Sequence, residues 1–234
     1  MLKSGVLLTQ RLGYLSGLLS DDGLLGRVPH AFETELPTSL ILDVVKDIVS
    51  DPRELETIAS CAQVHPNEFR KIILGSGEGS KLVLHRWTGQ GLHQSDIHSH
   101  RWNFCSLVVS GRIMSESFIV EPDVNGDYVQ YRYSSPGSSE AYAMNATSTA
   151  NVFSTGVITF NESEYYVQDY RELHRAGDLA KGSLTIVVQG KAMQETCNVV
   201  APKGARADGI QFIERPSLRQ VKSDLAELVD RLIS

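Results

Sequence analysis

The chain has 234 residues, of which 41% are hydrophobic and 21% are charged, and its formal net charge is −6. This length accommodates one domain, or one domain with an added helical region, and the composition is ordinary for a globular protein. Lys and Arg form no basic stripe, and no segment reaches the ~18 apolar residues of a membrane span, so the sequence argues against nucleic-acid binding and against membrane insertion.

The first third of the chain has helical periodicity, and we assign residues 1–66 to a helical N-terminal region. Leucines recur at helical spacing from Leu7 to Leu19 among polar residues, which indicates an amphipathic helix rather than a signal peptide. A second helix is expected after Pro37-Thr38-Ser39. Ser50-Asp51-Pro52 ends that helix and caps a third one, because an Asp before Pro accepts the free amides of a first turn.

The cysteine pattern bears on the cellular compartment. Cys61, Cys105 and Cys197 are widely spaced and include no CxxC pair. A disulfide framework is therefore not expected, and the pattern is typical of a protein in the reducing cytoplasm.

From about Lys81 the periodicity changes from 3.6 residues to two. Short β-branched and aromatic segments alternate with Gly, Asp and Asn, which predicts a sandwich or barrel over residues 67–200. The stretch from Pro136 to Thr149 is expected to be a loop or a frayed hairpin. A C-terminal extension, residues 201–234, is expected to carry an amphipathic helix over 217–233. The predicted strands are Lys81–Trp87, Asn103–Ser110, Arg112–Val120, Tyr128–Tyr133, Val152–Phe160, Glu164–Tyr170 and Ser183–Gln189.

The strongest chemical signal is Ile97-His98-Ser99-His100. On a strand, residues i and i+2 point the same way, so two imidazoles can bind one metal ion from one rigid wall. A third ligand has to come from another strand, and His174 precedes the turn at Gly177-Asp178. Three neutral imidazoles leave coordination positions open for a substrate and O2, although imidazole suits Fe, Zn, Cu and Ni alike.

The order of an HxH pair, a hydrophobic strand, Gly111 and a late histidine resembles the cupin pattern. The resemblance implies a mainly β fold, a cupin barrel (double-stranded β-helix or jelly roll) with an α-helical N-terminal region and a C-terminal helix. Within the cupins, the chain resembles the cysteine dioxygenase family of mononuclear iron thiol dioxygenases over about residues 40–190. The matching features include Ser50-Asp51-Pro52, Phe69-Arg70-Lys71, a strand ending at Trp87, and Leu173-His174-Arg175.

The resemblance implies a role for several residues. In the family, three histidines hold Fe(II), an Arg binds the substrate carboxylate, and a Cys lies beside the metal. Arg70 and Trp87 are accordingly expected to bind substrate, and Cys105 to be catalytic. Three structural alternatives remain: Arg70 can pair with Glu68 or Glu78 at the surface, Cys105 can be a small core residue, and Trp87 can belong to the ordinary barrel core. The implied metal ligands are His98, His100 and His174.

The chain departs from the family on the strand that follows His174. Thr185 can stand for the Ser of the family's Ser-His-Tyr relay, but Val187 and Gln189 replace its His and Tyr. A related oxygenase with another substrate is therefore an interpretation of equal standing with a dioxygenase of free cysteine.

Other candidates have no clear counterpart in the family. His85, two residues before Trp87, is a candidate acid–base group, with a structural histidine as its alternative. Glu116 is a candidate fourth metal ligand. The remaining histidines, His30, His65 and His93, are interpreted as surface residues.

Together these features predict a metal-dependent cupin oxygenase, an Fe(II) dioxygenase-type oxidoreductase that acts with O2 on a small carboxylate-bearing substrate, thiol or amino-acid-like in one version. Fe(II) is the expected ion, with Zn, Ni and Mn as alternatives. The competing hypotheses are a non-oxidative metal-dependent isomerase, lyase or hydrolase, and a small-molecule-binding cupin. The expected partners are the substrate and O2, without nucleic acid or membrane, and the expected state is a monomer or homodimer.

Overall fold

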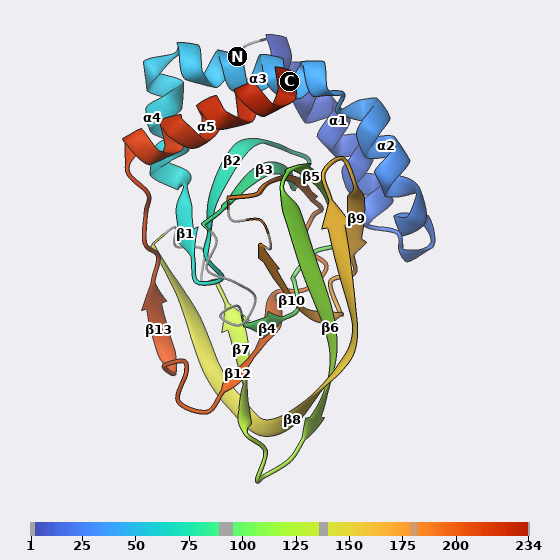
Figure 1. Ribbon diagram of the computed structural model, residues 1–234, viewed down its shortest axis with the longest axis vertical. Coiled ribbons are helices and arrows are strands. Elements are labelled where there is room, and N and C mark those ends of the chain that lie inside the picture. The colour runs from blue at the N-terminus through green and yellow to red at the C-terminus, as the bar shows by residue number, and fades with distance from the viewer. Residues whose placement is uncertain (1–2, 89–95, 136–139, 179, 181, 234) are drawn as a thin grey trace.

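A computed structural model describes residues 3–88, 96–135, 140–178, 180 and 182–233. Within these residues, a layer of helices covers one end of a barrel of antiparallel strands (Figure 1). The predicted fold class, mainly β with a helical N-terminal region and a C-terminal helix, is confirmed, and the barrel is cupin-like.

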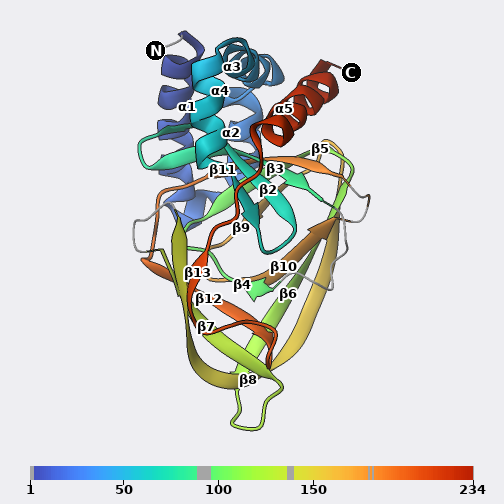
Figure 2. The same ribbon diagram turned by 90° about the vertical axis from the view of Figure 1, so that its left-hand side faces the viewer.

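The helical layer is built from both ends of the chain. The side chain of Asp51 accepts hydrogen bonds from the amides of Arg53 and Glu54, so the predicted cap is confirmed. Because α5 packs against α3 and α4, the two termini lie at the same end of the molecule (Figure 2). The helices are α1 (Lys3–Leu19), η1 (Asp22–Arg27), α2 (Val28–Glu35), α3 (Thr38–Ser50), α4 (Pro52–Cys61) and α5 (Leu218–Ile233).

Two antiparallel sheets form the barrel. The first has the strand order β1 (Gln63–His65), β2 (Phe69–Gly77), β3 (Ser80–Trp87), β11 (Leu184–Gln189), β5 (Phe104–Ser110), β9 (Tyr165–Gln168). The second has the order β13 (Gly209–Phe212), β8 (Ala141–Asn161), β6 (Arg112–Pro122), β10 (Leu173–Asp178), β4 (Ile97–His98), β12 (Thr196–Pro202), β7 (Tyr128–Ser134). Because β8 pairs with both β6 and β7, the second sheet closes on itself.

The first sheet separates two hydrophobic clusters. Side chains alternate along a strand, so Leu82 and Leu84 of β3 pack against the helices while Val83 and Trp87 face the barrel interior. Helix α1 lies close to β2: a Cβ at Gly77 would come within 2.9 Å of the backbone of Thr9. Burial of apolar surface on both faces of this sheet stabilises the fold and fixes which residues face the interior.

The main departure from the sequence prediction is β8. The stretch expected as a loop or a frayed hairpin, 136–149, contains the start of this 21-residue strand from Ala141 onward, which pairs antiparallel with β7, while residues 136–139 lie outside the described residues. Its Ser, Thr and Ala side chains give little apolar signal because many are exposed, and pairing with β7 supplies the order instead. Past the expected boundary at residue 200, β12 continues to Pro202 and β13 joins the second sheet.

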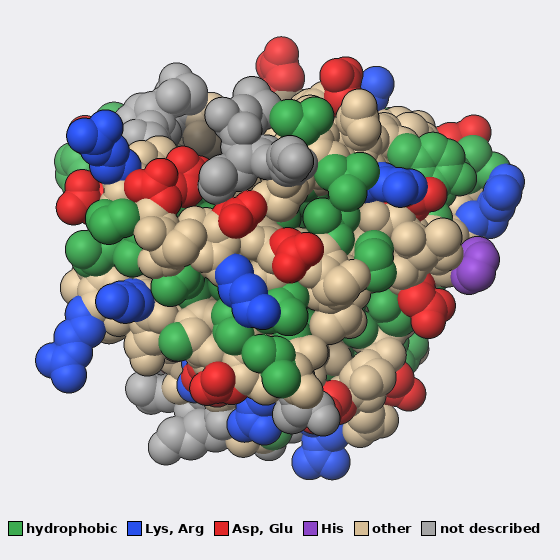
Figure 3. Space-filling model, turned by 90° about the horizontal axis from the view of Figure 1, so that it is seen from above, with side chains coloured by type: hydrophobic (Ala, Val, Ile, Leu, Met, Phe, Trp, Pro, Cys, Tyr) green, Lys and Arg blue, Asp and Glu red, His purple; other side chains and the backbone are tan. Residues whose placement is uncertain are grey.

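The surface agrees with the modest net charge. Seen from above, acidic, basic and apolar side chains are interspersed over the helical layer (Figure 3). Among the described residues, no helix is long and apolar enough to cross a membrane.

Candidate metal centre

Three histidines converge inside the barrel. His98 lies on β4 directly opposite His174 of β10 in the strand register, and His100 follows just beyond β4. The centroids of the three imidazoles lie 4.8 to 5.1 Å apart in every pairing. Each offers one ring nitrogen, and these nitrogens all lie within 4.8 Å of one another. The structure therefore brings together the three residues that the sequence proposed as a metal site.

Neighbouring groups orient two of the rings. The backbone carbonyl of Asp96 lies 3.0 Å from Nδ1 of His98, and the Ser115 hydroxyl lies 3.2 Å from Nδ1 of His174. When Nδ1 donates to these oxygens, the lone pair of Nε2 is free to bind a metal ion. Such outer contacts commonly fix the tautomer of ligating histidines.

The histidines fit a divalent metal ion. Burial lowers the pKa of His98, of His100 and of His174, and the neighbouring imidazoles lower those of His100 and His174 further, so all three rings are neutral at pH 7. Nε2 of His100 and Nε2 of His174 lie 2.9 Å apart. Two neutral imidazoles bring these nitrogens so close only with a proton or a cation between them. The nitrogen atoms of two adjacent histidine ligands on one metal ion, at zinc-like bond lengths, also lie about 3 Å apart, so the observed distance suits a shared ion.

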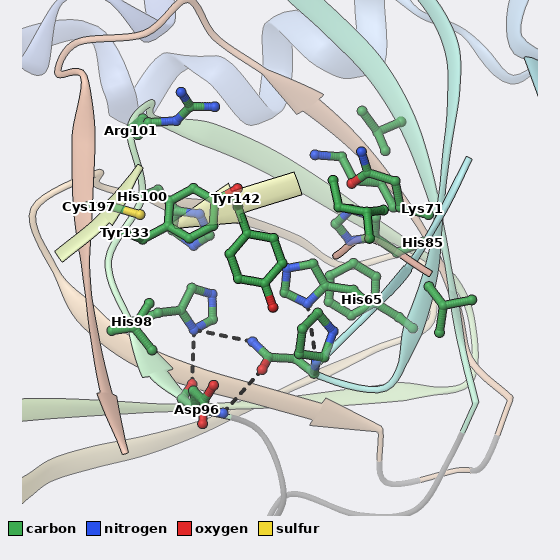
Figure 4. A pocket seen from close by; sticks show the side chains of 18 of the residues that line it. His65, Lys71, His85, Asp96, His98, His100, Arg101, Tyr133, Tyr142 and Cys197 are labelled. Carbon is green, nitrogen blue, oxygen red and sulfur yellow. Dashed lines mark hydrogen bonds between the residues drawn. The ribbon is translucent and has the colours of Figure 1, made fainter. Parts of the chain in front are cut away.

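His98 and His100 line a cavity of about 410 Å³, and the buried His174 lies next to both of them. Figure 4 shows that rings from several strands project into it, including His85 from β3, Tyr133 from β7 and Tyr142 from β8. Burial is the main cause that raises the pKa of both tyrosines, so their hydroxyls stay protonated at neutral pH. The cavity is large enough for a small organic molecule beside the histidines.

The structure does not place Arg70 in this cavity. Its guanidinium donates two hydrogen bonds of 2.6 Å to the carboxylate of Asp224 on α5, on the helical side of the sheet. The next residue, Lys71, lines the cavity instead. Successive side chains of a strand point to opposite faces, so an assignment that is wrong by one residue moves the cation to the wrong face. The predicted substrate role of Arg70 is corrected for this reason.

Cys105 also faces away from the cavity. It is fully buried in the cluster between the first sheet and the helices, while its neighbour Phe104 lines the cavity. Burial raises the pKa of its thiol to about 12, so it is not a reactive thiolate at neutral pH. The core interpretation of Cys105 holds, and its predicted catalytic role does not.

Trp87 points into the barrel interior without lining the cavity. Its indole nitrogen donates a 3.3 Å hydrogen bond to the hydroxyl of Thr185, and both residues are buried. The predicted direct contact of Trp87 with a substrate is therefore replaced by a supporting position behind the cavity wall.

His85 and His65 both line the cavity. The ring of Phe69 lies between them, with centroid distances of 4.3 Å to each imidazole. Burial lowers the pKa of His85 to about 3, so its imidazole is neutral at physiological pH. The interpretation of His65 as a surface residue is wrong, whereas His30 is exposed and His93 lies outside the described residues.

Glu116 is not a fourth ligand in this structure. It lies opposite Arg175 in the register of β6 and β10, and the two side chains form an ion pair at 2.7 Å. Among the described residues, the cluster that can hold a metal consists of the three histidines alone.

Sequence reasoning missed several cavity residues. Tyr133, Tyr142 and Cys197 come from β7, β8 and β12, which carry no recognisable motif. The inward position of Lys71 follows from the alternation of side chains along a strand that also carries Phe69, but this strand, β2, was not predicted. Arg101 and Trp102 were not missed, because they directly follow the HxH pair and this position predicts that they shape the mouth of the site.

No protein-family model matches the chain, and no curated protein matches it in sequence. Among solved structures it is similar to hydroquinone 1,2-dioxygenase in complex with Cd2+ and 4-hydroxybenzonitrile, at 14% identity and a TM-score of 0.34, over 55% of this chain and 67% of that chain. It is also similar to hydroxypropylphosphonic acid epoxidase from S. wedmorenis in complex with fosfomycin, at 10% identity and a TM-score of 0.32, over 80% of this chain and 96% of that chain. At these scores the likeness carries no argument about activity.

Proposed function

We propose that the protein is a metal-dependent oxygenase of the dioxygenase type, with Fe(II) on His98, His100 and His174, which acts with O2 on a small carboxylate-bearing molecule. The observation that carries the proposal is the convergence of three neutral imidazoles, of which those of His98 and His100 line a cavity of about 410 Å³. Three neutral ligands leave positions free on the ion, and Fe(II), when bound, supplies the redox chemistry that O2 requires.

The chain's own residues have separate tasks in this reaction. The Asp96 carbonyl and the Ser115 hydroxyl hold two imidazoles with Nε2 toward the ion. The cavity orients the substrate and excludes bulk water. A dioxygenase-type reaction places both oxygen atoms in the substrate, which also supplies the electrons, so no further reductant is needed.

A non-oxidative reaction needs a proton-transfer group, and the two residues predicted for that role, His85 and Glu116, give it little support. With its pKa at about 3, His85 is a weak base and is not protonated at neutral pH. Glu116 is engaged by Arg175. We therefore place the oxygenase first.

Oxygen uptake tests the proposal. The full chain is loaded anaerobically with Fe(II) or with Zn(II) and given a panel of small carboxylates, among them cysteine and benzoate, in an oxygen electrode. We expect uptake that requires both Fe(II) and one of the carboxylates, no uptake with Zn(II), and loss of uptake in His100→Ala. A matched control is His30→Ala, which removes an exposed histidine of α2.

Two results would contradict the proposal. One is an Fe(II)-loaded protein that consumes no more O2 with any of these compounds than the same amount of free Fe(II). The other is conversion of a substrate by the Zn(II) form without O2, which would establish a non-oxidative enzyme.

A further inference from the structure

Lys71 is a cation inside the cavity without an acidic partner. It lies opposite His85 in the register of β2 and β3, and its ammonium lies 5.5 Å from the centroid of Trp102. Among the described residues it forms no ion pair, and the undescribed internal ranges, 89–95, 136–139, 179 and 181, contain no Asp or Glu. Its positive charge is therefore not balanced by the protein at this position.

Arg101 is a second such cation on the same aromatic ring. Its guanidinium carbon lies 4.9 Å from the centroid of Trp102, and it also lines the cavity. Its Nε is buried and has no hydrogen-bond partner among the described residues. A buried donor without a partner is costly, so this nitrogen marks a place where an acceptor is expected.

The carboxylates that line the cavity do not balance these two cations. Asp96 accepts hydrogen bonds of 2.8 and 3.1 Å from Nε of Arg206, and Glu214 is exposed. Uncompensated charges in a confined space favour an anion from solution, and the flat face of Trp102 keeps both cations in place through cation–π contacts.

The rest of the lining suits an aromatic body. The ring of His65 stacks on Phe69, which lies tilted against His85, and the rings of Tyr133 and Tyr142 lie 5.3 Å apart, centroid to centroid. Figure 4 shows Tyr133 and Tyr142 projecting into the same space as His98 and His100. Aromatic side chains favour offset or edge-on contacts with a planar ligand.

We propose that Lys71, Arg101 and Trp102 form an anion subsite that binds the carboxylate of an aromatic carboxylic acid, with its ring among the aromatic side chains of the cavity. This inference rests on the proposed function, because it names the substrate class of the same site. The ammonium of Lys71 and the planar guanidinium of Arg101 are the kinds of donor from which a carboxylate accepts charge-assisted hydrogen bonds.

Binding of benzoate and of its neutral isostere benzamide tests the subsite. Titration calorimetry is done on the Fe(II)-loaded full chain without O2 and repeated after removal of the metal by a chelator, because benzoate can also bind a metal directly. We expect benzoate to bind at least about tenfold more tightly than benzamide in both forms. Lys71→Met and Arg101→Gln should each remove most of this preference and leave benzamide binding unchanged.

The controls are Lys222→Met and Arg219→Gln, which change exposed cations of α5. The proposal is overturned if wild type binds neither benzoate nor benzamide, or binds both with equal affinity. It is also overturned if both cavity variants bind benzoate like wild type. Phenylphosphonate is titrated as a competing anion, and tighter binding of phenylphosphonate than of benzoate would overturn the proposal as well. Because these measurements need neither turnover nor O2, a preserved benzoate preference without oxygen uptake would refute the proposed function alone. Oxygen uptake in the cavity variants equal to wild type would refute the subsite alone.

Discussion

At the scale of single residues, the charge that lines the cavity depends on which of two adjacent residues of β2 points inward. Arg70 and Lys71 are adjacent in sequence, yet one bonds to α5 and the other lines the cavity. A motif match identifies a basic pair but does not determine strand register, because register depends on pairing with β3. The three histidines were predictable because two of them have the i, i+2 spacing of a strand wall.

The Ser115 hydroxyl gives a residue-scale prediction about metal affinity. Ser115→Ala removes the group 3.2 Å from Nδ1 of His174, so this imidazole loses its fixed tautomer and orientation. We expect metal affinity to fall about tenfold, measured by competition with a chromophoric chelator. Ser117→Ala is the matched control on β6, since among the described residues the Ser117 hydroxyl forms no hydrogen bond to a histidine. Equal affinities in the two variants would contradict this role.

Lys71 predicts a pH dependence of stability. Burial, and then the nearby cations Lys81 and Arg101, lower its pKa from 10.5 to about 8, and the imidazoles of His65 and His85 that line the same cavity are neutral. Between pH 8 and 10.5 the unfolded chain therefore binds more protons at this residue than the folded chain does. The free energy of unfolding of wild type should rise across this interval relative to that of Lys71→Met.

Urea unfolding of both chains in the presence of a chelator, at pH 7 and at pH 10, checks the sign. Below pH 8 the difference between the two chains should be constant, because Lys71 is charged in both states. A difference that stays the same from pH 7 to pH 10 would show that the lysine is well solvated in the folded protein.

At the scale of elements, α5 is held on the barrel by charge as well as by apolar contacts. Asp224 is buried and accepts two hydrogen bonds from Arg70, while Glu227 pairs with Arg86 at 3.1 Å. Asp224→Asn leaves the partly buried guanidinium of Arg70 without its counter-charge. We expect the free energy of unfolding to fall by about 3 kcal/mol with metal content unchanged.

The matched control for this element is Asp230→Asn, an exposed position of the same helix. Chemical denaturation measures the free energy of unfolding of both variants, and metal analysis measures their metal content. If Asp224→Asn lost its metal while keeping its stability, the pair would belong to the site rather than to the attachment of α5.

The elements that sequence predicted well are those with a local signal. Helices α3 and α4 were bounded by the Asp51-Pro52 cap, and β3, β5, β6 and β11 were recognisable as short segments rich in β-branched and other apolar residues. The strands β2, β8, β12 and β13 were missed or shortened. Their order comes from pairing with distant strands, and glycines in β2 and small polar residues in β8 weaken the local pattern.

At the scale of the whole molecule, both sheets contribute to the site: the closed second sheet supplies two metal ligands and the rings of Tyr133 and Tyr142, and the first sheet supplies Lys71 and His85. His98 and His174 belong to β4 and β10, whereas Lys71 and His85 belong to β2 and β3. The cavity therefore depends on the packing of two sheets whose strands are far apart in sequence. This packing explains why the ligands were predictable from the chain and most of the cavity lining was not.

The central claim is that these three histidines hold one metal ion, and metal analysis of protein purified without chelators tests it most directly. We predict about one equivalent of metal per chain, with iron retained when Fe(II) is supplied, loss of most of it in His98→Ala, His100→Ala and His174→Ala, and full retention in His30→Ala. A wild-type chain that retains no metal after Fe(II), Zn(II), Ni(II) and Mn(II) are each supplied, or a His174→Ala chain with wild-type metal content, would contradict the account.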